Sequence, residues 1–96
     1  MMGKQLPITE AHVRCQVKDY LLWRGWFVIY HLAGLGSYPG IPDVQAVKDG
    51  RTVYIELKRP GGKQRPDQAK FQRDLEKAGG EYILCRGIED LQAAGI

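Results

Sequence analysis

The sequence has little cysteine and no long apolar run. These two shortages argue against a disulfide-rich or zinc-binding protein and against a membrane protein. It contains two cysteines among 96 residues, Cys15 and Cys85. Two such residues form neither a disulfide framework nor the ligand spacing of a structural zinc site. Both lie in apolar segments, so we expect buried free thiols. No signal peptide or membrane-length apolar run is apparent, which predicts a cytoplasmic protein without a membrane contact.

The sequence also lacks internal repeats, low-complexity segments and a base-reading module such as a zinc finger or basic zipper. Its length predicts one small domain over residues 1–96. The net charge is +3, which mildly favours binding to polyanions. Positive charge gathers in residues 58–73, a run typical of a solvated face or of a phosphate-binding surface. Its basic residues are Lys58, Arg59, Lys63, Arg65, Lys70 and Arg73.

A predicted β-hairpin over residues 43–58 organises the chain. Asp49-Gly50 favours a type I′ turn between two runs rich in β-forming residues. A two-residue turn at this point places Asp43 directly opposite Glu56. One face of the hairpin should meet the core, with Val44, Ala46, Val53, Ile55 and Leu57. The other face carries Asp43, Gln45, Tyr54, Glu56 and Lys58.

The opposed acids indicate a site for a cation. Two facing carboxylates repel each other, so the pair Asp43 and Glu56 is costly unless a positive charge lies between them. Lys58 lies on the same face, two residues beyond Glu56. Hard oxygen ligands suit Mg²⁺ or Mn²⁺, and such a centre with a nearby ammonium suits phosphodiester hydrolysis. The alternative is a surface hairpin that carries a cluster of charges.

The same residues resemble a nuclease signature. Pro42-Asp43, a spacer and Glu56-Leu57-Lys58 are similar to the PD-(D/E)XK pattern, and the details resemble the VRR-NUC family of virus-type replication-repair nucleases. Over residues 10–91, those details are Gly40-Ile41-Pro42-Asp43, Ile55-Glu56-Leu57-Lys58, Gly62-Lys63, Gln68, Gly79-Gly80 and Tyr82-Ile83-Leu84. The resemblance implies an α/β protein with a restriction-endonuclease-like core, a mixed four-stranded sheet flanked by helices in the order αβββαβ.

The resemblance also implies roles for individual residues in a Mg²⁺- or Mn²⁺-dependent DNA endonuclease. Asp43, Glu56 and the Leu57 carbonyl would bind the metal, and Lys58 would position water or stabilise the phosphate. Glu10 would be a third acidic group; the alternative is an acid that complements the dipole of its helix. Gln68 would point at the active site; the alternative is an amide satisfied by loop backbone. The expected phosphate contacts are Arg59, Lys63, Arg65 and Lys70.

The rest of the chain predicts the elements around the hairpin. A helix should run from about Glu10 to Arg24, with Thr9 as its N-cap, after a poorly ordered lead over residues 1–8. Further elements are expected as a strand at 26–31, a helix at 66–78, a strand at 81–85 parallel to the hairpin's second strand, and a short helix at 88–94. Tyr38, in the loop at 32–40, would either stack on a base or anchor the loop.

The predicted substrate is branched DNA such as a Holliday junction, cut by a homodimer in a phage-infected or prophage-carrying bacterium. Family members act in replication and repair, and short stand-alone versions look phage-like. A small core and the need to cut two strands favour two-fold pairing. The aromatic surface around Trp23, Trp26 and Tyr30 is one candidate interface; the alternative is that these residues belong to the core. The alternatives are a flap, nicking or restriction-type nuclease and a non-catalytic DNA-binding module.

Overall fold

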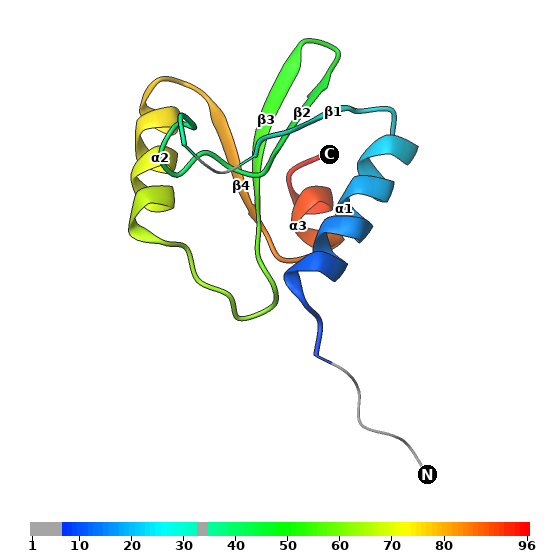
Figure 1. Ribbon diagram of the computed structural model, residues 1–96. Helices are drawn as coiled ribbons and strands as arrows, with labels where there is room; N and C mark the ends of the chain where they lie inside the picture. The colour runs from blue at the N-terminus through cyan, green and yellow to red at the C-terminus, as the bar shows by residue number, and fades with distance from the viewer. Residues whose placement is uncertain (1–6, 33–34) are drawn as a thin grey trace.

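The protein is an α/β structure built on one mixed four-stranded sheet with three helices (Figure 1). This computed structural model describes residues 7–32 and 35–96. Most of the lead predicted over residues 1–8, and part of the loop predicted at 32–40, lie outside the described residues. In chain order the elements are α1 (Glu10–Trp23), β1 (Phe27–Tyr30), β2 (Val44–Lys48), β3 (Arg51–Leu57), α2 (Pro66–Lys77), β4 (Glu81–Cys85) and α3 (Ile88–Ala93).

Local sequence signals determine both ends of α1. The Thr9 hydroxyl accepts a hydrogen bond from the His12 backbone N–H at 3.2 Å, and His12 Nδ1 accepts one from the Thr9 backbone N–H at 3.3 Å. This reciprocal pair satisfies two N–H groups at the helix start. The helix stops where Gly25 adopts a φ of +86°, in the left-handed region that glycine enters without strain. The predicted helix ends are confirmed to within one residue.

The hairpin has the predicted register. Lys48 pairs with Arg51 and Val44 pairs with Ile55 in an antiparallel ladder. Asp49 and Gly50 both have positive φ, at 51° and 80°, as a type I′ turn requires. β4 runs parallel to β3 after the α2 crossover, so the predicted mixed sheet is confirmed. Its strand order is β1-β2-β3-β4.

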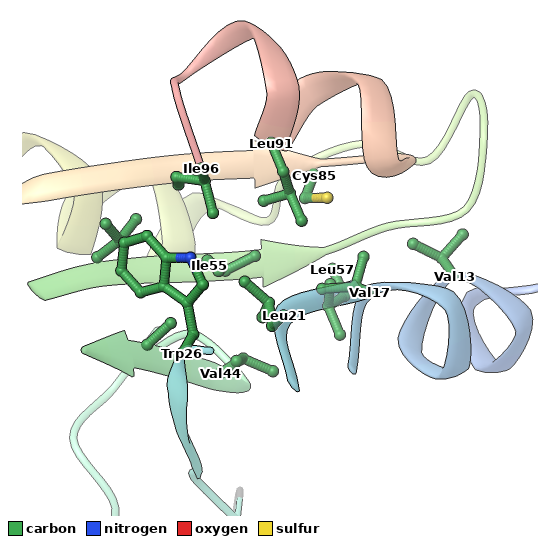
Figure 2. Packing of buried hydrophobic residues seen from close by; sticks show 12 residues of the cluster. Val13, Val17, Leu21, Trp26, Val44, Ile55, Leu57, Cys85, Leu91 and Ile96 are labelled. Atoms are coloured by element: carbon green, nitrogen blue, oxygen red, sulfur yellow. The ribbon is translucent and has the colours of Figure 1, made fainter. Parts of the chain in front are cut away.

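The hydrophobic core lies on one face of the sheet, beneath α1 and α3, whereas α2 covers the other face (Figure 1). Figure 2 shows side chains of α1, β2, β3 and the C-terminal segment meeting in this layer. The hairpin face predicted to be apolar is fully buried there. The buried cluster is Val13, Val17, Leu21, Trp26, Val44, Ala46, Val53, Ile55, Leu57, Cys85, Leu91 and Ile96.

An aromatic cluster connects α2 to its face of the sheet. The Phe71 ring lies 5.7 Å from the ring of Tyr54 on β3 and 6.4 Å from that of Tyr82 on β4, between centroids. Gln64 adds a polar contact by donating to the Tyr82 hydroxyl at 3.1 Å. Aromatic rings, rather than a stripe of aliphatic side chains, therefore pack α2 against the sheet. The buried position in the first turn of the helix is occupied by the polar Gln68.

The prediction that both thiols are buried is wrong for Cys15, which is exposed. Cys15 lies two positions from both Val13 and Val17, and two positions on a helix turn a side chain about 200° away from its stripe. Cys85 is buried as expected, and its thiol donates to the Gly87 carbonyl at 3.2 Å. Burial raises the pKa of the Cys85 thiol to about 11, which makes it a packed rather than a reactive group.

The candidate interface of Trp23, Trp26 and Tyr30 is wrong as a single surface, and the alternative of a core position is confirmed for Trp26. Trp26 is 6% exposed and packs in the core, whereas Trp23 is 81% and Tyr30 43% exposed. Trp26 directly precedes β1, and its side chain packs in the same layer as the buried residues of the hairpin, so it is covered from solvent.

In the part of the chain that the structure describes, none of the helices has both the length and the apolar character to cross a membrane.

Candidate active site

Asp43 and Glu56 lie at one end of the hairpin, where the sequence places them. Asp43 directly precedes β2, and its carbonyl accepts a hydrogen bond from the His31 backbone N–H at 2.8 Å. Continuing the β2–β3 register by one residue beyond Val44 and Ile55 brings Asp43 opposite Glu56. The Asp43 backbone is thus held on both sides, by β1 and by β3, and Glu56, itself on β3, pairs with Leu84 of β4.

The carboxyl group of Glu56 is buried and only partly satisfied. The residue is 2% exposed, and its Oε1 accepts a hydrogen bond of 2.8 Å from Gln68 Nε2. Lys58 Nζ lies 4.0 Å from the same oxygen. Oε2 is buried without a hydrogen-bond partner. A buried, unpaired carboxylate oxygen is costly, so this atom calls for a ligand that the polypeptide does not supply.

The electrostatic surroundings of Glu56 also indicate a missing cationic partner. Burial, together with the negative charge of Asp43, raises the pKa of Glu56 from 4.5 to about 7, although the Lys58 ammonium acts in the opposite direction. Near neutral pH the carboxyl therefore stays partly protonated when no further cation is present. A divalent cation beside Oε2 would favour the ionised form for the same reason that Lys58 does.

Gln68 connects α2 to the acid pair. Its Oε1 accepts the Arg65 backbone N–H at 2.9 Å, which leaves the amide NH₂ directed at Glu56. The side chain is 3% exposed. The alternative of an amide satisfied by loop backbone is confirmed for its oxygen, and its nitrogen donates to Glu56. A role for Gln68 in an active site stays a prediction. The predicted inward position in the first turn of α2 is confirmed.

Gly40 holds the segment before Asp43 against α2. Its φ is +76°, and a Cβ built on it would overlap the carbonyl group of Asp67. Only glycine permits this approach of the loop to the first turn of the helix. Because Asp43 follows Gly40 by three residues and Gln68 follows Asp67, this contact fixes where the two site segments lie relative to each other.

Arg14, which sequence reasoning missed, flanks the acid pair. Its Nη2 lies 3.6 Å from Asp43 Oδ2 and 3.8 Å from Glu10 Oε2. Glu10 is thus at the predicted end of the sheet, about half exposed, with a guanidinium between it and Asp43. Its role as a metal ligand stays a prediction. The i, i+4 spacing of Glu10 and Arg14 was the available signal, because such residues are neighbours on a helix.

Two cavities of about 330 Å³ each flank the acid pair. One is lined by Arg14, Tyr30, His31, Leu32 and Asp43. The other is lined by Glu10, Lys58, Arg59, Gly62 and Lys63. The second brings three cations to one hollow, as an anion-binding site requires.

A second residue missed from the sequence holds the basic loop in place. Arg86 donates from Nε at 3.1 Å and from Nη2 at 2.8 Å to the Gly62 carbonyl. This forked contact ties the loop after β3 to the end of β4, and Lys63 follows directly in the chain. No sequence signal connects residues so far apart.

The predicted phosphate contacts therefore divide into two groups. Arg59 and Lys63 share the cavity of Lys58. Arg65 instead pairs with Asp67 at 3.2 Å, and Lys70 pairs with Asp74 at 2.6 Å, both on exposed parts of α2 or its start. DNA contact by any of the four stays a prediction.

The donor set fits a hard divalent cation bound by few protein ligands. Glu56 Oε2 has no partner, and Asp43 lies opposite with a partly exposed side chain. Among residues 7–32 and 35–96, no three His, Cys, Asp or Glu side chains form a group that could hold a metal ion. An ion here would use two carboxylates with main-chain and water oxygens, the kind of shell that Mg²⁺ accepts.

A comparison with known protein families gives no match, and a comparison with curated proteins gives none either. The function is therefore argued from the site itself.

Proposed function

We propose that this protein is a Mg²⁺- or Mn²⁺-dependent DNA endonuclease of the VRR-NUC type, with a PD-(D/E)XK core, that hydrolyses phosphodiester bonds. The observation that carries the proposal is the buried, unpartnered Oε2 of Glu56 beside Asp43 and Lys58. A carboxyl group at this depth next to a second carboxyl destabilises the fold. A catalytic cation accounts for both acids and for the lysine.

In this proposal each residue has a distinct task. Asp43, Glu56 and the Leu57 carbonyl hold the metal, with Glu10 nearby as a further acid. The bound ion supplies Lewis-acid chemistry, by acidifying water and offsetting charge on the phosphate. Lys58, whose side chain is 12% exposed, places its ammonium where the phosphate develops charge. Gln68 keeps the Glu56 carboxyl in its orientation.

The basic hollow beside the acids supports a nucleic-acid substrate. Lys58, Arg59 and Lys63 line it together, and Arg86 holds the loop that forms one wall. Such contacts read the DNA backbone and its shape rather than the bases. Branched DNA such as a Holliday junction is the proposed substrate. A flap, nicking or restriction-type activity is the alternative within the same chemistry.

We further propose that the working unit is a homodimer joined along β1. This strand is at the edge of the sheet and pairs with β2. Since His31 donates to Asp43, alternation along the strand directs the N–H and C=O groups of Val28 and Tyr30 outward. Phe27 beside them is 67% exposed. Two such edges related by a two-fold axis would pair and cover this apolar side chain.

Cleavage of a panel of labelled DNAs tests the activity. Linear duplex, flap, fork and four-way junction are incubated with and without Mg²⁺, using the native protein and the variants Asp43→Asn and Lys58→Met. We expect metal-dependent cleavage that Asp43→Asn abolishes. Lys58→Met should lower turnover by about two orders of magnitude while DNA still binds, the usual loss for an electrostatic catalytic group.

The panel also decides between the alternatives. Cleavage that persists in EDTA, or in Asp43→Asn, would refute the metal mechanism. Binding without cleavage of any DNA would instead identify a non-catalytic DNA-binding module. Light scattering at micromolar protein, repeated with Phe27→Lys, tests the dimer. A native monomer that cuts linear duplex as readily as a junction would leave a plain endonuclease.

A further inference from the structure

A third cavity, of about 300 Å³, opens between the loop before β2 and α2. Its lining residues are Tyr38, Pro39, Asp67, Lys70, Phe71 and Asp74. It shares no lining residue with the two cavities beside the acid pair. The proposed nuclease centre therefore leaves this cavity without a role.

Two aromatic rings form the wall of the cavity. Tyr38 meets Phe71 edge to face, with centroids 5.7 Å apart and planes at 75°. Phe71 is braced from the sheet side by Tyr54 and Tyr82. Tyr38 itself remains 59% exposed. A fixed ring thus supports a second ring that still has a free surface for stacking.

The charges at the rim do not oppose a polyanion. The two carboxylates of the lining are each paired with a cation. Lys70 Nζ lies 2.6 Å from Asp74 Oδ2, and Arg65 Nε lies 3.2 Å from Asp67 Oδ1. The rim is therefore close to neutral, and it offers an exposed aromatic surface on which an unpaired base can stack.

The cavity also lies close to the acid pair along the chain. Phe71 follows Gln68 by three residues on α2, so the two are neighbours on its surface. Asp43 follows Tyr38 by five positions, and an extended chain of that length spans at most about 18 Å. A DNA strand advances about 3.4 Å per nucleotide, so roughly five nucleotides cover this distance.

We propose that the Tyr38–Phe71 cavity binds one unpaired nucleobase of a DNA strand whose backbone reaches the Asp43–Glu56 pair. The base stacks on the free face of Tyr38. A base inside a duplex is already stacked and cannot enter, so the cavity favours strands with an unpaired position, as at a branch or a flap. The inference rests on the proposed function in taking the ligand to be DNA, and it supplies a structural basis for a preference among DNA shapes.

Binding in EDTA, where cleavage is blocked, tests the inference. The affinities for a short oligothymidylate and for a fully paired duplex are measured by fluorescence anisotropy. The variants are Tyr38→Ala, Tyr38→Trp and, as a matched control on α1, Trp23→Ala, which removes another exposed aromatic ring. Loss of one stacked base is worth about 1–3 kcal/mol, or roughly 5- to 150-fold.

We expect Tyr38→Ala to lose that factor on the single strand and little on the duplex, with Tyr38→Trp and Trp23→Ala close to native. An equal loss on both DNAs, or no loss on the single strand, would overturn the inference. In the native protein, photo-crosslinking of an oligonucleotide containing 5-iodouracil should map to Tyr38. A crosslink that maps only elsewhere counts against the cavity.

The two proposals can fail separately. A native protein that cuts no DNA but binds single strands through Tyr38 would lose the nuclease proposal and keep this site. A protein that cuts DNA with metal while Tyr38→Ala leaves single-strand affinity unchanged would keep the nuclease and lose this site.

Discussion

Gln68 Nε2 donates a 2.8 Å hydrogen bond to Glu56 Oε1 in a buried position, and this contact joins α2 to the end of β3. The two residues are twelve apart in sequence. Gln68 Oε1 is held by the Arg65 backbone N–H, so the amide cannot turn its oxygen toward the acid without losing that bond. The helix thereby sets the orientation of the carboxyl group.

Replacing Gln68 with leucine should therefore act through Glu56. The variant leaves Oε1 buried without its donor, and we expect a loss of about 1–3 kcal/mol in the free energy of unfolding. The ionised carboxyl also loses a favourable bond, so the acidic limb of the cleavage–pH profile should move to higher pH. Denaturant unfolding and the pH profile are the measurements.

Gln72→Leu is the matched control on the same helix, because Gln72 bonds Gln64 rather than the acid pair. It should leave the pH profile in place. If both variants shift the profile equally, Gln68 has only a packing role.

The stability of the metal-free protein should fall as the pH rises from about 4.5 to about 7. The folded state raises the pKa of Glu56 from 4.5 to about 7, so in this interval the unfolded chain releases a proton that the folded chain retains. Folding is therefore favoured most below 4.5, and that contribution is lost as the pH passes about 7. Its size is on the order of 3 kcal/mol.

Chemical denaturation across this pH range in EDTA measures the effect. Glu56→Gln should flatten the profile, because glutamine does not titrate, and should be the more stable protein near pH 7. Added Mg²⁺ or Mn²⁺ should stabilise the native protein at pH 7 but not Glu56→Gln. A native profile as flat as that of the variant would mean that folding does not raise the pKa of the Glu56 carboxyl.

Gly40→Ala should disturb the site without changing any side chain in it. The substitution combines a left-handed φ with an overlap against the Asp67 carbonyl. Gly36→Ala is the matched control, because its φ is +88° but an added Cβ would meet nothing within 4 Å. The φ alone should cost about 1–2 kcal/mol.

We expect Gly36→Ala to show that cost in thermal unfolding with cleavage retained. Gly40→Ala should lose more stability and most of the cleavage. Equal behaviour of the two alanine variants would argue against a close contact between the loop and α2.

Removing the charge of Lys63 should weaken DNA binding uniformly across sequences. Lys63→Gln takes one cation from the hollow that it shares with Lys58 and Arg59. The slope of log K against log salt should become shallower by roughly one. Lys77→Gln, at the far end of α2, should leave the slope unchanged. A loss confined to one DNA sequence would indicate base readout at Lys63.

The sequence by itself determined the local geometry of this protein. Asp49-Gly50 specifies the hairpin turn, and with a period of two residues the turn alone places Asp43 opposite Glu56. Thr9 and Gly25 delimit α1 through bonds to residues three or four positions away. Helical spacing likewise placed Gln68 on the inward face of α2. These features depend on neighbours in the chain, which the sequence displays directly.

Only the tertiary structure decided which distant groups meet at the acid pair. Arg14 reaches Asp43 because α1 packs over the end of the sheet, and Arg86 holds Gly62 because β4 ends beside the basic loop. The missing partner of Glu56 Oε2 is likewise visible only when every surrounding atom is placed. Trp26 lies in the core for the same reason, since packing between elements decides which side of each element is covered.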